Sequence, residues 1–424
     1  MILIDKIRGN KNLVNGGIFT LFAFINQGFS FVLLIILANY IAPDEYGQLN
    51  LFTTFVQLFT IFISLGTTGY IAVTFFKKER AELNRTINAV LIVSTGVLFV
   101  FFAVLAIFSS WFERVIGINV EYQWVALLIC YFQVYNAINL DIWRLKEQPF
   151  QYGLYSLSMV VLNFVITLIL VINYHQGWLG RLYAQVAVAI VYFFVSLIFL
   201  FKRGYIVFSL PERKLYSELF NFGIPLIPHM ASGWLKQGAD RYIINFFLSV
   251  SVVGLYSFAM NFANIIIIIG TSFNATNSVY IYKNLSEGYL KNKAKLEKQE
   301  KFMMLFYLAV CIALYFVCLW GIPLFLPKYS DSVIYLLPLC LSAMFGCYYQ
   351  LFVNYLFYYS KTKQLMMITF SASLIQVALS YCFTRYGAVA TAMTNLLGQF
   401  LTFMFVWIYS KKFLRYQEII ETNS

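Results

Sequence analysis

Three charged residues stand inside a segment that otherwise has the composition of a membrane span. The stretch GWLKQGADRYII, residues 233–244, contains Lys236, Asp240 and Arg241 between apolar sequence on both sides. A charge that faces lipid costs at least ~3 kcal/mol on insertion scales, so such residues face the protein interior or a water-filled cavity. This group is therefore the first candidate for a functional site.

The spacing of these polar residues places them together on a helix. At 100° per residue, His229, Lys236 and Asp240 share one stripe. Gln237 and Arg241 lie on the neighbouring row. Two interpretations stay open. Lys236 and Asp240 are four residues apart and can form a structural intrahelical ion pair, or the group contributes to a transport pathway.

An ion pair between Lys236 and Asp240 would leave Arg241 without an acidic partner, and a second acidic residue is a candidate for that role. Asp141 lies three residues before Arg144, near the inner end of the fourth predicted span.

Uncharged polar residues occur at mid-depth in several other predicted spans. Interhelical hydrogen bonding explains any one of them. Their distribution over both halves of the chain favours a polar lining between two bundles, suited to a hydroxyl-rich substrate. The residues are Asn26, Gln27, Gln57, Gln133, Asn136, Asn261, Asn264, Gln350, Asn354 and Gln399.

The elements that position these residues follow from composition. Of 424 residues, 61% are hydrophobic and 11% are charged, and the mean hydropathy is +0.75, which is typical of a polytopic membrane protein. We expect about twelve spans. Their approximate limits are 17–42, 49–73, 86–109, 123–143, 153–173, 180–201, 224–248, 254–280, 302–325, 333–357, 364–384 and 388–410.

The basic residues indicate the orientation. Of 30 Lys and Arg, 24 lie in one set of alternate connections and 4 in the other, which predicts that both termini are cytoplasmic. The same distribution explains the net charge of +12 by topology and argues against nucleic acid as a partner. The sequence further predicts four regions, 1–201 as an N-terminal six-helix bundle, 202–223 as a cytoplasmic linker, 224–410 as a C-terminal six-helix bundle and 411–424 as a cytoplasmic tail.

Several kinds of chemistry have no motif in this chain. The sequence has no GxxxxGK[ST] loop, no HExxH and no GxSxG, and its two histidines are His175 and His229. Six cysteines lie in apolar runs without metal-ligand spacing. We therefore expect no enzyme activity, no cofactor and no metal centre.

Two segments resemble bacterial polysaccharide flippases. ANYIAPDEYGQLNLFTTFVQLFTIFISLGT, residues 38–67, is similar to their first outer turn and second helix, where an apolar helix ends in a Pro-acidic-x-Tyr-Gly turn. Residues 219–259 are the more specific match. The shared features are the Phe222-Gly223-x-Pro225 start, the Asp240-Arg241 pair and the Gly254-x-Tyr256 start of the next helix.

This resemblance, to the polysaccharide transporter branch of the multidrug/oligosaccharidyl-lipid/polysaccharide exporter superfamily, implies an all-α membrane protein with two six-helix bundles around a central cavity. The implied activity is translocation of an undecaprenyl-diphosphate-linked oligosaccharide, such as an O-antigen repeat unit, across the bacterial inner membrane by alternating access, driven by an H⁺ or Na⁺ gradient. Lys236 and Arg241, with Arg144 as a third candidate, would contact the diphosphate, because fixed cations can replace its lost hydration. Asp240 and Asp141 are the ion-coupling candidates. Membrane lipids, a polysaccharide polymerase and chain-length machinery are candidate partners.

Two other functions remain as alternatives. A multidrug/cation antiporter of the same superfamily would need an acidic cavity, whereas the seventh span carries two positive charges and one negative charge. A membrane polysaccharide polymerase usually needs a large outward loop, and every predicted outward connection is short.

Overall fold

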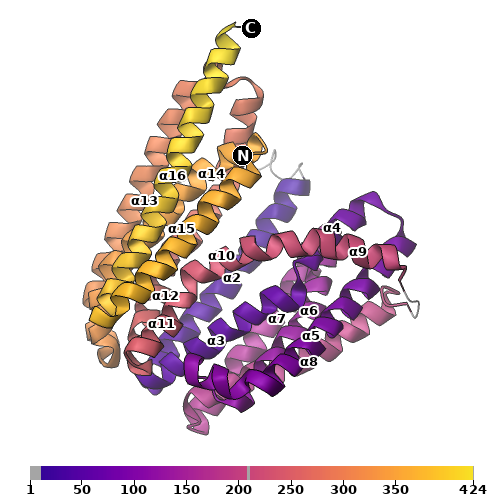
Figure 1. Ribbon diagram of the computed structural model, residues 1–424, viewed down its shortest axis with the longest axis vertical. Coiled ribbons are helices and arrows are strands. Elements are labelled where there is room, and N and C mark those ends of the chain that lie inside the picture. The colour runs from indigo at the N-terminus through magenta and orange to yellow at the C-terminus, as the bar shows by residue number, and fades with distance from the viewer. Residues whose placement is uncertain (1–10, 208–210, 424) are drawn as a thin grey trace. The chain divides into compact units, whose positions relative to one another are not determined.

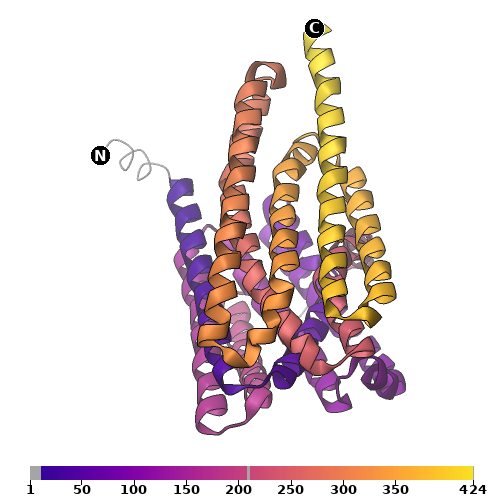
Figure 2. The same ribbon diagram turned by 90° about the vertical axis from the view of Figure 1, so that its left-hand side faces the viewer.

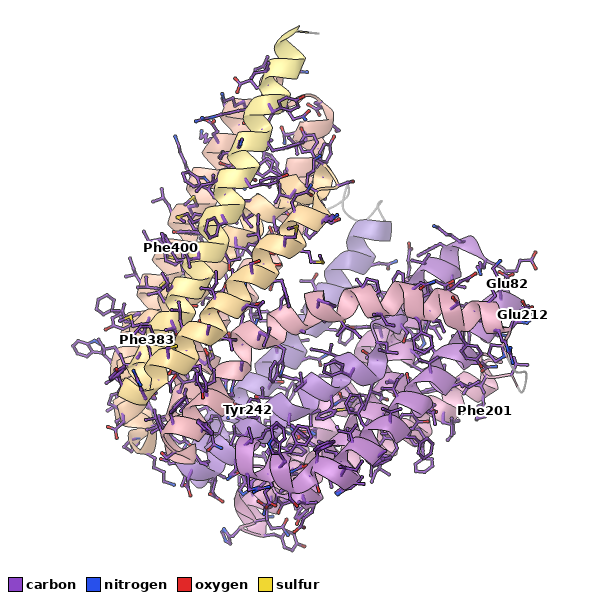
Figure 3. All side chains as sticks on the ribbon, in the orientation of Figure 1. Glu82, Phe201, Glu212, Tyr242, Phe383 and Phe400 are labelled. Atoms are coloured by element: carbon purple, nitrogen blue, oxygen red, sulfur yellow. The ribbon has the colours of Figure 1, made fainter. Side chains whose placement is uncertain are left out.

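The chain is helical almost throughout. The structure, a computed structural model, describes residues 11–207 and 211–423, and these residues contain no β-strand (Figure 1; Figure 3 adds the side chains in the same orientation). In this part of the chain, eleven helices are long and apolar enough to cross a membrane, with mean hydropathies between 1.4 and 2.9. The all-α membrane fold predicted from the sequence is confirmed.

Two compact units make up the fold, Met1–Ala231 and Ser232–Ser424, which we call unit 1 and unit 2. The division falls inside helix α10 (Ile227–Gln237). The segment 202–223, predicted as a linker, belongs to unit 1 and contains helix α9 (Arg213–Gly223).

Unit 1 is built of long helices that pack against their neighbours, with α2 on α7, α6 on α3 and α8, and α5 on α6 (Figure 1). Its remaining helical segments are α2 (Lys11–Tyr40), α3 (Pro43–Ser64), α4 (Thr67–Lys77), α5 (Arg80–Ile116), α6 (Val120–Leu145), α7 (Pro149–Leu168), the π-helix η1 (Ile169–Asn173), α8 (Gly177–Lys202) and the 3₁₀ turn η2 (Ile224–Leu226).

Local signals explain where several of these helices start and stop. Proline lacks an N–H and suits the first turn of a helix, and Pro43 begins α3. The Glu45 side chain accepts a hydrogen bond from the main-chain N–H of Ala42 at 3.1 Å, which satisfies one donor at the helix start. The span predicted at 49–73 is divided into α3 and α4 at Gly66, whose φ of 63° is readily adopted by glycine.

Unit 2 contains the remaining long helices, of which α14 packs against both α12 and α16. Figure 2 shows that α16 and the connected ends of α12 and α13 reach past the turn that joins α14 to α15. The segments are α11 (Ala239–Phe247), α12 (Val250–Ser286), α13 (Tyr289–Phe325), η3 (Pro327–Ser332), α14 (Val333–Tyr358), α15 (Thr362–Phe383), η4 (Thr384–Tyr386) and α16 (Ala388–Asn423).

The segment predicted as one span at 224–248 is not a single helix. Helix α10 ends at Gln237 and α11 begins at Ala239, with Gly238 between them. Glycine inside a helix costs about 1 kcal/mol relative to alanine, so Gly238 weakens the helix at this point. The prediction of a continuous seventh helix is wrong, and Lys236 and Asp240 stand on different helices.

Candidate functional site

The carboxyl group of Asp240 is enclosed by neutral hydrogen-bond donors of unit 2. Asp240 is fully buried. Its Oδ2 accepts hydrogen bonds from the Tyr256 hydroxyl at 2.9 Å and from Nδ2 of Asn395 at 3.0 Å, and its Oδ1 accepts one from the Ser380 hydroxyl at 2.9 Å. These donors come from α12, α16 and α15. A buried carboxyl group held this way is a site that can take up a cation or a proton.

Lys236 points into the same unit from the other side of the helix break. Its Nζ donates to the Thr402 hydroxyl at 2.9 Å and lies 6.0 Å from the ring centroid of Tyr349. The main-chain carbonyl of Lys236 accepts hydrogen bonds from the side-chain amides of Gln376 and Asn395 at 3.1 and 3.0 Å. A carbonyl at the end of a helix needs such outside donors.

Arg241 is also engaged inside unit 2. Its Nε donates to the Ser257 hydroxyl at 3.0 Å, and its Nη1 donates to the main-chain carbonyl of Gln237. Gln237 itself has an exposed side chain. The buried fractions of Lys236 and Arg241 are nearly equal, since 8% and 7% of their surfaces are exposed.

The intrahelical ion pair between Lys236 and Asp240 does not form. Among the residues that the structure describes, no Lys or Arg nitrogen lies within 4.0 Å of an Asp240 oxygen. The break at Gly238 removes the four-residue helical register that the pair needs. The predicted ion pair is therefore wrong, although the two residues share Asn395 as a hydrogen-bonding partner.

Arg144 and Asp141 form an ion pair with each other on α6. The distance between Nη2 of Arg144 and Oδ1 of Asp141 is 2.6 Å. The Arg144 side chain is 60% exposed and the Asp141 side chain 17%. Asp141 therefore has a cation partner on its own helix, and its role in ion coupling stays a prediction.

Unit 1 contains a pocket of about 590 Å³ among α2, α3, α6, α7 and α8, lined by apolar side chains with polar ones between them. We call it the unit 1 pocket. Three residues predicted from the sequence as polar lining, Gln57, Gln133 and Asn136, are brought together there. Its polar lining residues are Ser30, Thr53, Gln57, Thr60, Gln133, Asn136, Asn163, Arg181 and Gln185.

Arg181 is the cation of the unit 1 pocket. Its Nη1 donates to the hydroxyl of the buried Thr167 at 3.0 Å. In the described part of the chain, no carboxylate oxygen lies within 4.0 Å of its guanidinium nitrogens, and no Asp or Glu lines the pocket. A guanidinium beside amides and hydroxyls suits an anionic, hydroxyl-rich ligand, because it can bind two oxygens of one phosphate or carboxylate at once.

Close packing of two helices positions Arg181. An added Cβ at Gly180 would lie 3.1 Å from the main-chain carbon of Leu170 and 3.0 Å from the Val171 side chain. Glycine therefore allows α8 to approach the π-helix η1 at the end of α7. Single-turn π-helices are frequent at functional sites, and here one begins two residues after Thr167, the partner of Arg181.

Two of the other predicted lining residues, Asn26 and Asn354, form hydrogen bonds between helices. In unit 1, Nδ2 of Asn26 donates to the Ser156 hydroxyl at 3.0 Å, while Gln27 is exposed. In unit 2, Nδ2 of Asn354 donates to Oδ1 of Asn274 at 2.8 Å. Partly buried positions are held by Asn261, Asn264, Gln350 and Gln399, and the side chain of His229 lies outside the described structure.

A comparison with protein families decides the family. Residues 13–278 match the model of a family described as polysaccharide biosynthesis protein. The chain belongs to the polysaccharide biosynthesis protein family. The matched residues include the whole unit 1 pocket, and they include Asp240 with its donor Tyr256. The donors Ser380 and Asn395 lie beyond the matched residues.

Two relatives of this family member come from Haemophilus influenzae. A protein named after the Lsg locus is 26% identical over 360 residues, which cover 82% of this chain and 85% of the relative. A second membrane protein is 25% identical over 352 residues, covering 81% and 83% of the two chains.

Solved structures similar to this family member are transporters. An inward-facing multidrug resistance MATE family transporter of the MOP superfamily has a TM-score of 0.78 at 15% identity, covering 92% of this chain and 95% of the other. A MOP superfamily transporter from Pyrococcus furiosus, reported to have a binding pocket of reversed polarity, has a TM-score of 0.65 at 16% identity, covering 97% and 98%. These similarities establish a MOP transporter fold.

Proposed function

We propose that this protein is a flippase that moves an undecaprenyl-diphosphate-linked oligosaccharide across the bacterial inner membrane by alternating access, driven by an ion gradient. The family supplies the link to polysaccharide biosynthesis. The observation that carries the proposal is the unit 1 pocket, where Arg181 stands among amide and hydroxyl side chains without a carboxylate.

The chemistry of the pocket fits a glycan attached to a diphosphate. Sugar hydroxyls both donate and accept hydrogen bonds, and the side-chain amides of Gln57, Gln133 and Gln185 offer both kinds of partner. A diphosphate that enters a low-dielectric region loses hydration, and the Arg181 guanidinium can replace part of it. Lys236 and Arg241, the diphosphate ligands predicted from the sequence, are occupied inside unit 2 in this conformation, so Arg181 is our first candidate for this contact.

The Asp240 site is our candidate for ion coupling. A carboxyl group surrounded by oxygen and amide groups can hold a proton or Na⁺ in one conformation and release it in another. Ser380 and Thr394, whose hydroxyl oxygens are 2.7 Å apart, supply further oxygen atoms beside it. Binding of a cation here would neutralise a fully buried charge.

Efflux of organic cations is the second candidate function, because a MATE family transporter shares the fold. A pocket for organic cations needs carboxylates or a surplus of aromatic faces. The unit 1 pocket has Arg181 instead, and the described residues that line it include no Asp or Glu. This charge favours the flippase.

The test is a flipping assay in proteoliposomes. A fluorescent oligosaccharide linked to a polyprenyl diphosphate is placed in both leaflets, and a membrane-impermeant reagent quenches the outer molecules. We expect the wild-type protein to expose the inner pool when an H⁺ or Na⁺ gradient is imposed. Absence of flipping together with extrusion of ethidium would reject the proposal in favour of efflux.

A matched pair of variants tests the pocket. Arg181→Gln should reduce flipping at least tenfold, since a lost charge-assisted hydrogen bond costs about 1.5–3 kcal/mol. Arg114→Gln, the same substitution at an exposed position of α5, should leave flipping unchanged. Equal rates in both variants would remove Arg181 from the substrate site.

A further inference from the structure

A second cavity lies at the ends of α13 and α16, and it shares no residue with either candidate site. Its volume is about 1100 Å³, and its lining comes from residues 289–297 of α13 and 407–419 of α16. These are the helix ends that extend past the α14–α15 turn in Figure 2. We call it the terminal groove.

The terminal groove crosses the border between apolar and charged sequence. On α16 the exposed residues Trp407 and Ile408 close the apolar part of the helix, and Lys411 and Lys412 follow within one turn. Tryptophan is enriched where hydrocarbon meets lipid headgroups. By the distribution of Lys and Arg, this border is the cytoplasmic one.

Ion pairs neutralise some of the basic residues around the groove. Nζ of Lys293 lies 2.9 Å from a carboxylate oxygen of Glu418, and Nζ of Lys411 lies 2.7 Å from Glu300. Lys412 and Arg415 line the groove as well and are exposed. Within the described residues, neither has a carboxylate oxygen within 4.0 Å, so two positive charges face outward at this border.

These two cations lie on one stripe with apolar residues. Ile408, Lys412 and Arg415 stand at positions i, i+4 and i+7 of α16, which share one face of a helix. Seven residues of helix rise about 10 Å, whereas the headgroup layer beyond the hydrocarbon core is about 5–8 Å thick on each side. With Ile408 at the edge of the hydrocarbon, Lys412 lies about 6 Å further out, within the headgroup layer. Arg415 begins just beyond this layer, and its long side chain can reach back to the lipid phosphates, because side chains on a helix tilt toward the N-terminus.

We propose that the terminal groove binds an anionic phospholipid of the cytoplasmic leaflet, with its phosphate between Lys412 and Arg415 and its acyl chains against Trp407 and Ile408. Basic pockets between membrane helices on the cytoplasmic side suit such headgroups. This site is independent of the transported substrate, and its occupant differs from the lipid-linked diphosphate in carrying a single phosphodiester.

The experiment is native mass spectrometry of the full-length protein released from vesicles that contain equal amounts of phosphatidylglycerol and phosphatidylcholine. We expect retained phosphatidylglycerol to exceed phosphatidylcholine about ten- to thirtyfold, the preference that two basic residues near the membrane surface give. The double variant Lys412→Gln/Arg415→Gln should lose this preference. The control Lys291→Gln/Lys298→Gln, which removes the same charge from exposed positions of α13 outside the groove, should keep it.

Competition identifies the source of the bound anion. Inorganic phosphate and undecaprenyl diphosphate are added to the wild-type protein in separate arms, and neither should displace phosphatidylglycerol. Displacement by phosphate alone would show a simple anion site, and displacement by undecaprenyl diphosphate would show a substrate site. Either result, or an equal loss of preference in the control variant, overturns the proposal. Because this readout involves no transport, it stands or falls separately from the flippase function.

Discussion

Two substitutions of Asp240, to Ala and to Asn, distinguish a packing role of its carboxyl group from an ion-binding role. Asp240→Ala leaves the buried Tyr256 hydroxyl without its acceptor. Ser380 keeps its contact with Thr394, and Asn395 keeps its bond to the Lys236 carbonyl. At about 1–3 kcal/mol for the orphaned hydroxyl and about 1 kcal/mol for each of the two weakened donors, the free energy of unfolding should fall by about 3–5 kcal/mol.

Asp240→Asn should behave differently. The new carbonyl oxygen can accept from Tyr256 and Asn395, and the new amide can donate to the hydroxyl oxygen of Ser380. The substitution removes no volume, and it removes a buried charge that has no cation within 4.0 Å among the described residues. We therefore expect a loss below about 1 kcal/mol, together with loss of the gradient dependence of transport.

Thermal unfolding in detergent micelles measures the stability of both variants, and the proteoliposome assay measures gradient dependence. Asp331→Asn, at an exposed position of unit 2, is the control for both. An Asn variant as unstable as the Ala variant would refute the reasoning, because it would mean that the three donors require a permanent carboxylate. An unchanged response to the gradient would leave Asp240 with a packing role only.

Three further predictions address the other parts of the molecule. Gly180→Val should lower the free energy of unfolding by about 1–3 kcal/mol, because its Cβ would press on the main chain of Leu170. Thermal unfolding measures this loss. The hydrogen bond from Tyr70, with neighbouring lysines, holds the pKa of the Glu218 carboxyl below its usual value of 4.5. The ionised Glu218 therefore stabilises the docking of α9 fully above pH 4.5. This stabilisation is lost as the pH falls through the lowered pKa. Hydrogen exchange of α9 should reveal this pH dependence, and Glu218→Gln should abolish it. Lys236→Met should change the melting temperature little, because it removes a buried charge and keeps the length of the side chain; a large drop in melting temperature would contradict this.

Hydropathy predicted the fold well because each span is a long apolar run, and its period and length need no tertiary information. The charge count was a poorer guide to the pocket. Arg181 lies four residues after the start of α8, close to a connection between spans. The count of basic residues assigned it to that connection, so it was not predicted as a site residue. Its spacing of four residues from Gln185 and seven from Val188 places all three on one helix face, a pattern that was readable from the sequence.

Polar stripes in the sequence also indicated the partners of Lys236 and Asp240, the charged residues on either side of the helix break. Ser373, Gln376 and Ser380 follow a spacing of three and four residues on α15, and all three are fully buried. Asn395 and Thr402 are seven residues apart on α16. Such stripes predict buried polar contacts between helices, but pairing each donor with an acceptor required the positions of α10 and α11, which hydropathy alone joined into one helix.

The charges of α10 and α11 are linked through the helix break itself. When the helix stops at Gln237, the Lys236 carbonyl turns to donors on α15 and α16. One of these donors, Nδ2 of Asn395, also binds the Asp240 carboxylate. A cation that binds Asp240 would compete with Asn395 for the carboxylate oxygen Oδ2. It would thereby alter the hydrogen bond from Asn395 to the Lys236 carbonyl at the helix break. Under the proposed function, this single amide group would couple ion binding at Asp240 to the helix break, and the coupling would convert an ion gradient into movement.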